Sequence, residues 1–442
     1  MFQDSIAAIS TALQQGAISI VRISGEDAFR IAKKILTISI DDKPSHTIHY
    51  AYVIDPISKE RIDEVMVSVF KAPKTFTGEN MIEINCHGGT YVTKEVLRLC
   101  LENGARLANR GEFSRRAFLN GKMDLTKAEA IHDMVMAMDK NNARMAVNAL
   151  QGSVRKMMDP LIEKLLDIIA NIEVNIDYPE YDDVEILSDK ILLPKCSALL
   201  KEMDAILRRA NNGKVLKEGI KTAIIGKPNV GKSSLLNALL EEDKAIVSDI
   251  EGTTRDMVEG SIRLDNVTLH VIDTAGIRKS EDAIEKIGIK KSKQILQEAQ
   301  LVIVLFDGSK PLDELDQELL DISKAKERLL VYNKKDQNVH EGINISAKDQ
   351  DIDELMDALN AKYDEYHEAY QIPMLQNERQ LALMQQAKQA LLRAIDALNM
   401  QMEIDLVTID LQSAYYALKE ILGEVSKDDL LDTLFSKFCL GK

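Results

Sequence analysis

Residues 221–239 read KTAIIGKPNVGKSSLLNAL, and this stretch decides the fold of the segment around it. A β-branched run leads into the pattern G-x-x-x-x-G-K-S at residues 226–233, and an apolar helical pattern follows. A strand, a glycine-rich loop and a helix in this order form a phosphate-binding loop, because backbone N–H groups and the helix N-terminus converge there. Lys232 is expected to reach the outer phosphates of a nucleotide, and the Ser233 hydroxyl to bind Mg²⁺.

Two downstream stretches fit the parts of a nucleotide site that sense the γ-phosphate. The motif DTAG at residues 273–276 ends the predicted strand LHVI, so Asp273 would hold the metal ion through its water shell. The stretch GTTRD at residues 252–256 lies between the phosphate loop and DTAG, where a GTPase keeps its first switch. Thr254 is the natural second protein ligand of Mg²⁺ in such a switch.

The base that the site accepts is indicated by NKKD at residues 333–336, which ends the predicted strand LLVY. A carboxylate at Asp336 accepts hydrogen bonds from the ring N–H and the exocyclic amine of guanine, which adenine does not supply. Ser346 and Ala347 follow another short apolar run and would close the guanine pocket through a backbone amide. These motifs, in this order and each at a strand end, indicate a GTPase.

The group that orients the attacking water is not fixed by these motifs. Ile277 stands where Ras-type GTPases carry a water-orienting Gln, so another side chain must position the water. Glu281, Asp282 and Glu285 are the nearby candidates, although a solvated surface charge is the simpler interpretation of each.

The chain as a whole is predicted to be a multidomain protein with an inserted P-loop, Ras-like α/β GTPase domain. Residues 1–120 mix short β-rich runs with helices and predict an α+β domain. Residues 121–215 and 371–442 carry only helical periodicity and are expected to form two parts of an all-α domain. Residues 216–370 alternate continuous β-branched runs with helices, which is typical of a parallel sheet covered on both faces.

Two local signals concern the helical region. Thr126 followed by Glu129 predicts a capping box at the start of its first helix. The acidic stretch around Pro179 predicts a break between two helices.

Composition narrows the class of protein. The 442 residues carry a net charge of -15, of which residues 221–370 contribute -10, so the acidity lies mainly in the GTPase segment. It therefore says little against a nucleic-acid partner, although this chain alone is expected to bind RNA weakly. The four Cys form neither a disulfide framework nor a zinc pattern, and no apolar run is long enough for a membrane span. We expect a cytoplasmic protein without a signal peptide and without a membrane partner.

The sequence resembles the MnmE (TrmE) family of tRNA-modification GTPases over essentially its full length. The resemblance is carried by GAISIVRISG at 16–25, FTGENMIEINCHGG at 76–89, GEFSRRAFLNGKMDLTKAEA at 111–130, GTTRD at 252–256 and FCLGK at 438–442. It implies a potassium-dependent GTPase in which two G domains of a homodimer meet. Asn229 matches the potassium ligand of the family, with groups at Ser248, Ile250 and Thr253 completing the site, and Glu285 matches the water-positioning carboxylate.

Motifs and resemblance together assign the catalytic residues as Glu285, Lys232 and Cys439, and Mg²⁺ to Ser233 and Thr254. The residues expected to bind GTP are Asn229, Val230, Gly231, Lys232, Ser233, Ser234, Ser248, Asp249, Ile250, Glu251, Gly252, Thr253, Thr254, Asp273, Thr274, Ala275, Gly276, Asn333, Lys334, Asp336, Ser346 and Ala347.

The resemblance also implies a tetrahydrofolate derivative, in the 5-formyl or methylene form, bound by the N-terminal domain, which would also dimerise. Arg22, Glu83, Lys122 and Lys442 are the matching residues. From the residues alone, Cys439 beside two Phe is expected to be a small buried apolar side chain as readily as a nucleophile.

The implied reaction adds an aminomethyl or carboxymethylaminomethyl group to C5 of the wobble uridine of certain tRNAs. It would be carried out in a heterotetramer with MnmG (GidA), a partner that brings FAD and NADH. Two alternatives stay open: a ribosome-assembly switch GTPase, and a folate enzyme with a regulatory GTPase insert that does not act on tRNA.

Overall fold

The computed structural model describes residues 4–137, 140–177, 189–241, 258–264, 267–272, 296, 298–364, 373–425, 431, 434–436, 438 and 441. The chain divides into two compact units, and each is described by itself. The first comprises Met1–Met138, Ala146–Leu200 and Leu383–Lys442, and the second Asp139–Met145 and Lys201–Ala382.

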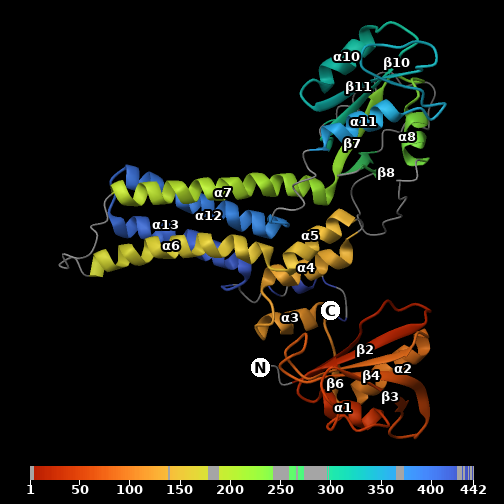
Figure 1. Cartoon of the computed structure of the whole chain (residues 1–442), viewed down its shortest axis with the longest axis vertical. Helices are drawn as coiled ribbons and strands as arrows, with labels where there is room; N and C mark the ends of the chain where they lie inside the picture. The colour runs from red at the N-terminus through yellow and green to blue at the C-terminus, as the bar shows by residue number, and fades with distance from the viewer. Residues whose placement is uncertain are drawn as a thin grey trace. The chain divides into compact units, whose positions relative to one another are not determined.

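The first unit opens with a six-stranded sheet in the order β3-β4-β5-β2-β1-β6, antiparallel except for the β1–β6 pair (Figure 1). Its strands are β1 (Ser5–Ile9), β2 (Ile18–Ser24), β3 (Thr47–Ile54), β4 (Arg61–Phe70), β5 (Met81–His87) and β6 (Ala105–Leu107). Helices α1 (Ala28–Ile35) and α2 (Thr90–Glu102) cover one face, so the α+β prediction is confirmed.

Side-chain alternation in β2 separates the core of this sheet from its opposite face. Val21 and Ile23 are fully buried with α1 and α2, whereas Arg22 and Ser24 point to the other side. On that side α3 (Glu112–Leu119) packs Phe113 against the β1 side chains. The candidate folate residues of β2 and β5 therefore lie on the α3 side of the sheet.

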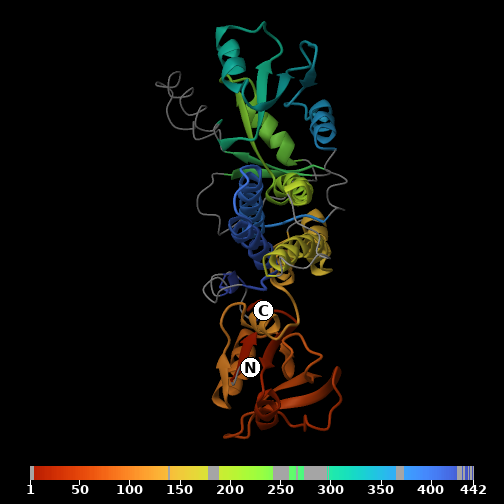
Figure 2. The ribbon, with the colours of Figure 1, turned by 90° about the vertical axis from the view of Figure 1, so that its left-hand side faces the viewer.

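Long helices make up the rest of the first unit. They are α4 (Leu125–Met136), α5 (Lys140–Leu150), α6 (Ser153–Asp177), α7 (Asp189–Glu218), α12 (Glu378–Asn399) and α13 (Ile404–Leu422), of which α5, α7 and α12 extend into the second unit. Helices α6 and α13 pack against each other, and Figures 1 and 2 both show them side by side. The helical segments before and after the inserted α/β segment therefore lie in one bundle.

The capping box predicted at Thr126 and Glu129 is wrong. The N-cap of α4 is Asp124, whose carboxylate accepts from the Lys127 N–H at 2.9 Å and from the Thr126 hydroxyl at 2.7 Å. Asp124 takes this position because an Asp with extended backbone is as good a cap as Thr and lies two residues earlier. The break predicted around Pro179 lies outside the described residues, between the end of α6 and the start of α7.

The second unit holds a six-stranded sheet in the order β12-β11-β10-β7-β9-β8, parallel except for the β8–β9 pair. Its elements are β7 (Ile220–Gly226), α8 (Lys232–Glu241), β8 (Val258–Arg263), β9 (Thr268–Ile272), β10 (Leu301–Asp307), α10 (Glu314–Ser323), β11 (Glu327–Asn333), β12 (Ile343–Ile345) and α11 (Asp353–Lys362).

Both faces of this sheet are buried, as its continuous apolar strands predict. Ile303 lies in the core with α8 and α11, while its neighbours Val302 and Val304 lie in a second core with α10. Over the described residues of both units, no helix is long and apolar enough to cross a membrane.

Candidate functional site

The phosphate loop has a strand on one side and a helix on the other, as predicted. Asn229 and Gly231 adopt left-handed backbone, with φ of 61° and 102°. A Cβ atom on Gly226 would lie 2.5 Å from the Leu305 carbonyl oxygen of β10, so only a glycine lets the loop start against that strand. The loop ends at the N-terminus of α8, where free backbone N–H groups attract anions.

Lys232 lies inside this loop. Its Nζ donates to the carbonyl oxygens of Gly226 at 2.8 Å and Lys227 at 2.7 Å, and burial lowers the pKa of the ammonium group. A phosphate would offer Lys232 a charged acceptor in place of these neutral ones, and hydrogen bonds between charged groups are the stronger kind. The position therefore suits a lysine that neutralises a bound anion.

Lys227 links the phosphate loop to the start of α10 through ion pairs. Its Nζ lies 2.7 Å from a carboxylate oxygen of Asp313 and 2.7 Å from one of Asp316. These two residues form the capping box of α10, and Asp316 is only 3% exposed. Burial alone would lower the pKa of Lys227, but the hydrogen bonds to the two carboxylates raise it above its ordinary value. The loop is thus tied to the start of α10 by an ion pair that is partly shielded from water.

One buried side chain joins three of the predicted motifs. Asn333 is 6% exposed, donates from Nδ2 to the Val230 carbonyl oxygen at 2.8 Å, and accepts at Oδ1 from the Ala347 N–H at 3.0 Å. A Cβ atom on Gly231 would come closer to Asn333 Nδ2 than the 3.0 Å that real side chains keep. The structure therefore brings the phosphate loop, NKKD and the Ser346-Ala347 pair together.

Lys334 and Asp336, the two charged residues of NKKD that were predicted to bind the nucleotide, differ in their contacts: Lys334 is ion-paired, and Asp336 is exposed. Lys334 has a φ of 69°, and its Nζ lies 2.7 Å from Asp307 Oδ2. Burial alone would raise the pKa of Asp307, but hydrogen bonds from Lys334 and Ser309 outweigh burial and bring it to about 2. Asp336 is exposed and makes no hydrogen bond or ion pair with the described part of the chain. Its carboxylate is available for a ligand.

In the N-terminal sheet, Arg22 and Glu83 form a pair. They face each other across β2 and β5, with Arg22 Nε 2.8 Å and Nη2 2.7 Å from Glu83 Oε1. The remaining terminal nitrogen, Nη1, donates to the Gly441 carbonyl oxygen at 3.1 Å, and the guanidinium lies over the Phe113 ring. The predicted folate residues Arg22 and Glu83 are therefore neighbours, and the C-terminal segment reaches them.

Lys122 lies by the loop between β4 and β5. Its Nζ donates to the Pro73 carbonyl oxygen at 2.8 Å, and the nearby Asn120 side chain donates to the Thr77 carbonyl oxygen at 2.8 Å. This loop leads into β5, the strand that carries Glu83. The structure places all three described folate candidates around the start of β5.

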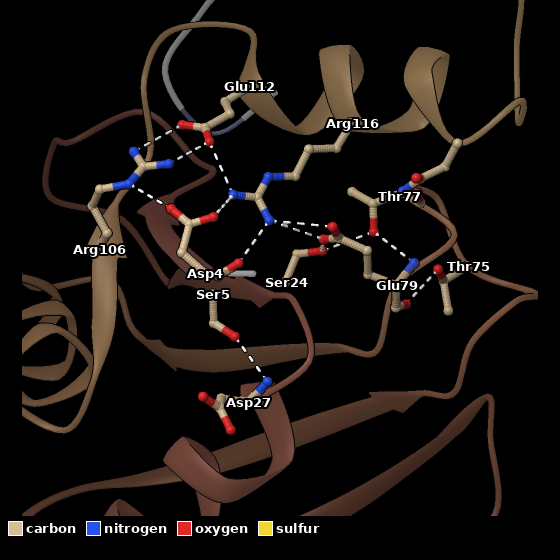
Figure 3. Close-up of polar contacts among 11 residues, drawn as sticks. Asp4, Ser5, Ser24, Asp27, Thr75, Thr77, Glu79, Arg106, Glu112 and Arg116 are labelled. Atoms are coloured by element: carbon tan, nitrogen blue, oxygen red, sulfur yellow. Dashed lines mark hydrogen bonds and ion pairs between the residues drawn. The ribbon is translucent and has the colours of Figure 1, made fainter. Parts of the chain in front are cut away.

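An ionic network centred on the buried Arg116 was not anticipated from sequence (Figure 3). Arg116 of α3 is fully buried and donates to Asp4 Oδ1 at 2.7 Å, Glu79 Oε1 at 3.2 Å and Glu112 Oε1 at 3.1 Å. Burial alone would raise the pKa of Glu112, but hydrogen bonds from Arg106, the Asn109 N–H and Arg116 lower it. The network joins α3 to β1 and to the β4–β5 loop.

The C-terminal segment docks on α3 and α4 through aromatic contacts. Phe435 and Phe438 are buried edge to face, with ring centroids 5.2 Å apart, and Phe438 stacks on His132 at 4.9 Å. A Cβ atom on Gly111 would lie 2.5 Å from the Phe435 carbonyl oxygen, so the segment approaches α3 closely. Two residues of the chain's FCLGK motif are described, Phe438 here and Gly441 beside Arg22.

Comparison with known proteins identifies the family. A model of the MnmE helical domain matches residues 125–439, and a model of the N-terminus of the GTP-binding protein TrmE matches residues 5–122. The tRNA modification GTPase MnmE of Ligilactobacillus salivarius is 45% identical, over 99% of this chain and 98% of that protein. The chain belongs to the MnmE family of tRNA modification GTPases. The protein of the same name from Streptococcus sanguinis is 44% identical over 99% of each chain.

Several residues assigned in this MnmE-family chain lie outside the described residues. They are Ser248, Asp249, Ile250, Glu251, Gly252, Thr253, Thr254, Asp273, Thr274, Ala275, Gly276, Glu285, Cys439 and Lys442. Of the described phosphate-loop residues, Asn229, Ser233 and Ser234 are exposed and Val230 is buried.

Sequence reasoning missed Lys227 and Arg116 in this MnmE-family chain. Lys227 occupies a variable position of the phosphate-loop pattern, and its partners lie 86 and 89 residues away. Arg116 contacts Asp4 and Glu79, which are 112 and 37 residues away. Lys227 and Arg116 each lie in a sequence motif quoted above, and their charge is the only local signal. A charge alone does not identify the residue with which it pairs.

Proposed function

We propose that this chain is a GTPase whose nucleotide site consists of the phosphate loop, NKKD and the Ser346-Ala347 pair. The observation that carries the proposal is the Asn333 side chain, which ties Val230 of the phosphate loop to Ala347. Because Asp336 follows on the same loop and is exposed, its carboxylate is free to select guanine.

The residues around the phosphates would divide the work as follows. Backbone N–H groups of the loop bind the phosphates, and Lys232 leaves the Gly226 and Lys227 carbonyl oxygens to meet the outer ones. The exposed Ser233 hydroxyl at the start of α8 is the oxygen donor that suits Mg²⁺, with Thr254 as the second protein ligand.

Asn229 stands exposed in the left-handed turn of the loop, where its side-chain oxygen suits a potassium ion shared with groups at Ser248, Ile250 and Thr253. A monovalent cation there would neutralise charge that an arginine finger meets in other GTPases. We assign the orientation of the attacking water to Glu285.

We further propose that the N-terminal sheet binds a tetrahydrofolate derivative near Arg22, Glu83, Lys122 and Lys442. Support comes from the meeting of the Arg22–Glu83 pair, the β4–β5 loop and the C-terminal segment at one place. All three guanidinium nitrogens of Arg22 already donate to Glu83 or to the Gly441 carbonyl oxygen. Arg22 would therefore anchor the C-terminal segment beside the cofactor. The Cys439 thiol would then be held near it.

A homodimer through the N-terminal sheet is part of the proposal. On the face opposite α1 and α2, Ile48 is 62%, Tyr50 is 52% and Met66 is 45% exposed. Tyr50 and Met66 are directly paired across β3 and β4, so these side chains form one apolar area. Apolar areas of this kind on a sheet face are typical of protein interfaces.

The reaction we propose is the addition of an aminomethyl or carboxymethylaminomethyl group to C5 of the wobble uridine of certain tRNAs, in the cytoplasm. The partner would be MnmG, which supplies FAD and NADH, and GTP hydrolysis would drive the domain movements. Because residues 221–370 carry -10 of the net charge, most of the tRNA-binding surface is expected on MnmG.

Nucleoside mass spectrometry of tRNA tests this proposal. Cells that lack this protein should lose C5-modified wobble uridine and regain it with the wild-type gene. The Asp336→Asn variant should fail to restore it, whereas Lys310→Met, which removes an exposed charge in the same domain, should restore it fully. Unchanged wobble uridine in the deletion, with a defect in ribosome assembly instead, would contradict the proposal.

A further inference from the structure

Helix α13 is apolar on two sides, and only one of them is buried. Val407, Leu411 and Leu418 are fully buried within the bundle. On another side Leu406 is 46%, Ile409 is 60% and Tyr416 is 54% exposed. A surface helix ordinarily carries polar residues on the side away from its core, so the second apolar side calls for a partner.

The exposed side chains follow a regular spacing. Leu406, Ile409, Ser413 and Tyr416 succeed one another at steps of three, four and three residues, and we call these four residues the α13 stripe. Steps of three and four keep side chains on one line along a helix, and this is the spacing of a seam against a second helix. In the turn before α13, Met400 and Met402 are also 73% and 47% exposed.

The charges around the stripe define what covers it. Residues 394–418 contain no Lys or Arg, but they contain Asp396, Glu403, Asp405 and Asp410. Lys419, three residues after Tyr416, is paired with Glu424 at 3.2 Å. Glu403 and Asp405 are exposed beside the first turn of the stripe, and the nearby Arg393 is engaged with Asp410. The surface is therefore apolar along its length and negative beside its first turn.

This charge distribution decides between the possible occupants. A second copy of α13 would bring carboxylates against carboxylates, and RNA would bring phosphates against them, so both are repelled. An amphipathic helix with apolar residues at three- and four-residue steps and Lys or Arg beside them is complementary in both respects.

We propose that the α13 stripe is the docking surface for such a basic amphipathic helix of a partner protein. We take MnmG as that partner, and in this respect the proposal rests on the proposed function. A protein that binds tRNA phosphates is rich in Lys and Arg, as the docking helix must be. The apolar seam supplies the affinity, and Glu403 and Asp405 supply orientation and the rate of association.

The test measures binding of purified MnmG to the full-length chain by isothermal titration calorimetry. Ile409→Glu and Leu406→Glu place a carboxylate in the seam and should each weaken binding at least tenfold. Ile57→Glu makes the same change at a residue that is 88% exposed in the N-terminal domain, and binding should stay within twofold. The double change Glu403→Lys and Asp405→Lys should weaken binding, most strongly at low salt. Because the changed side chains are exposed, circular dichroism and GTP hydrolysis should match the wild type.

The outcomes separate the docking surface from the proposed function. If wild type binds MnmG and Ile409→Glu binds equally well, the docking surface is wrong and the partner stands. If the wild-type chain does not bind MnmG, MnmG is not the partner, and both the proposed function and the assignment of a MnmG helix to the α13 stripe are wrong. If Ile409→Glu instead changes the sedimentation coefficient of the chain alone, the stripe is an interface between copies, and the inference is overturned.

Discussion

Replacing Gly231 by Ala should abolish tight nucleotide binding while leaving the protein folded. The residue has a φ of 102°, which L side chains rarely adopt, and the new Cβ would overlap Asn333 Nδ2. Asn333 has no room to move without losing the Val230 carbonyl oxygen or the Ala347 N–H. The substitution therefore separates the phosphate loop from NKKD and the Ser346-Ala347 pair, which we propose to bind guanine.

The size of the effect follows from the two buried hydrogen bonds and the backbone strain. Leaving a buried polar group unpaired costs about 1–3 kcal/mol, and a strained non-glycine φ costs on the order of 1–3 kcal/mol. Together these suggest a loss of roughly 3–5 kcal/mol from the binding-competent state, which is roughly 10²- to 10³-fold in affinity at about 1.4 kcal/mol per tenfold.

The assay is a fluorescence titration of the full-length protein with a methylanthraniloyl analogue of GDP. Gly342→Ala is the matched control, because Gly342 also has a positive φ, 123°, but its Cβ would have only an ordinary 3.8 Å contact with Tyr332. It should lose some thermal stability and keep its affinity within about threefold. If Gly231→Ala binds within threefold of wild type, the idea that Asn333 couples the two loops is wrong.

Three further predictions concern single side chains. Lys227→Met should raise the KM for GTP about tenfold with little change in kcat, and Lys227→Arg should return the KM to the wild-type value. A fall in kcat alone would show that the ion pair between Lys227 and α10 does not position the phosphate loop. Arg116→Met should lower the free energy of unfolding of the first unit by about 3–5 kcal/mol in urea denaturation. It leaves the Glu79 carboxylate, which is 11% exposed, without its ion-pair partner, whereas Glu112 keeps Arg106; a loss below about 1 kcal/mol would contradict that. Asp336→Asn should shift preference from GTP towards xanthosine triphosphate in competition binding, and unchanged GTP affinity would rule out the guanine contact.

The architecture of the G domain could be predicted because its strands are buried on both faces. Runs such as LVIVLFD have no polar side to present, and in the structure Ile303 and Val304 indeed enter different cores. The nucleotide motifs could also be predicted to lie near one another. The phosphate loop, DTAG, NKKD and Ser346-Ala347 each follow a strand in the sequence, and the carboxyl ends of parallel strands lie at the same edge of the sheet.

Partners of charged residues could not be predicted in the same way. Whether Arg22 meets a ligand or Glu83 depends on the register between β2 and β5, which alternation alone does not fix. The capping error at Thr126 has the same origin on a smaller scale, because Asp124 and Thr126 are both good caps and only the path of the incoming chain selects one.

The FCLGK motif shows why a short sequence signature can resist interpretation until the fold is known. Gly441 has a φ of 85°, and a Cβ atom there would collide with the Ile9 backbone, so glycine is required where this segment meets β1. Its carbonyl oxygen accepts from Ser10 Oγ at 3.2 Å and from Arg22, 431 and 419 residues away. Gly441 of this motif therefore docks on the N-terminal sheet, and the role that we propose for Cys439 would depend on that backbone fit.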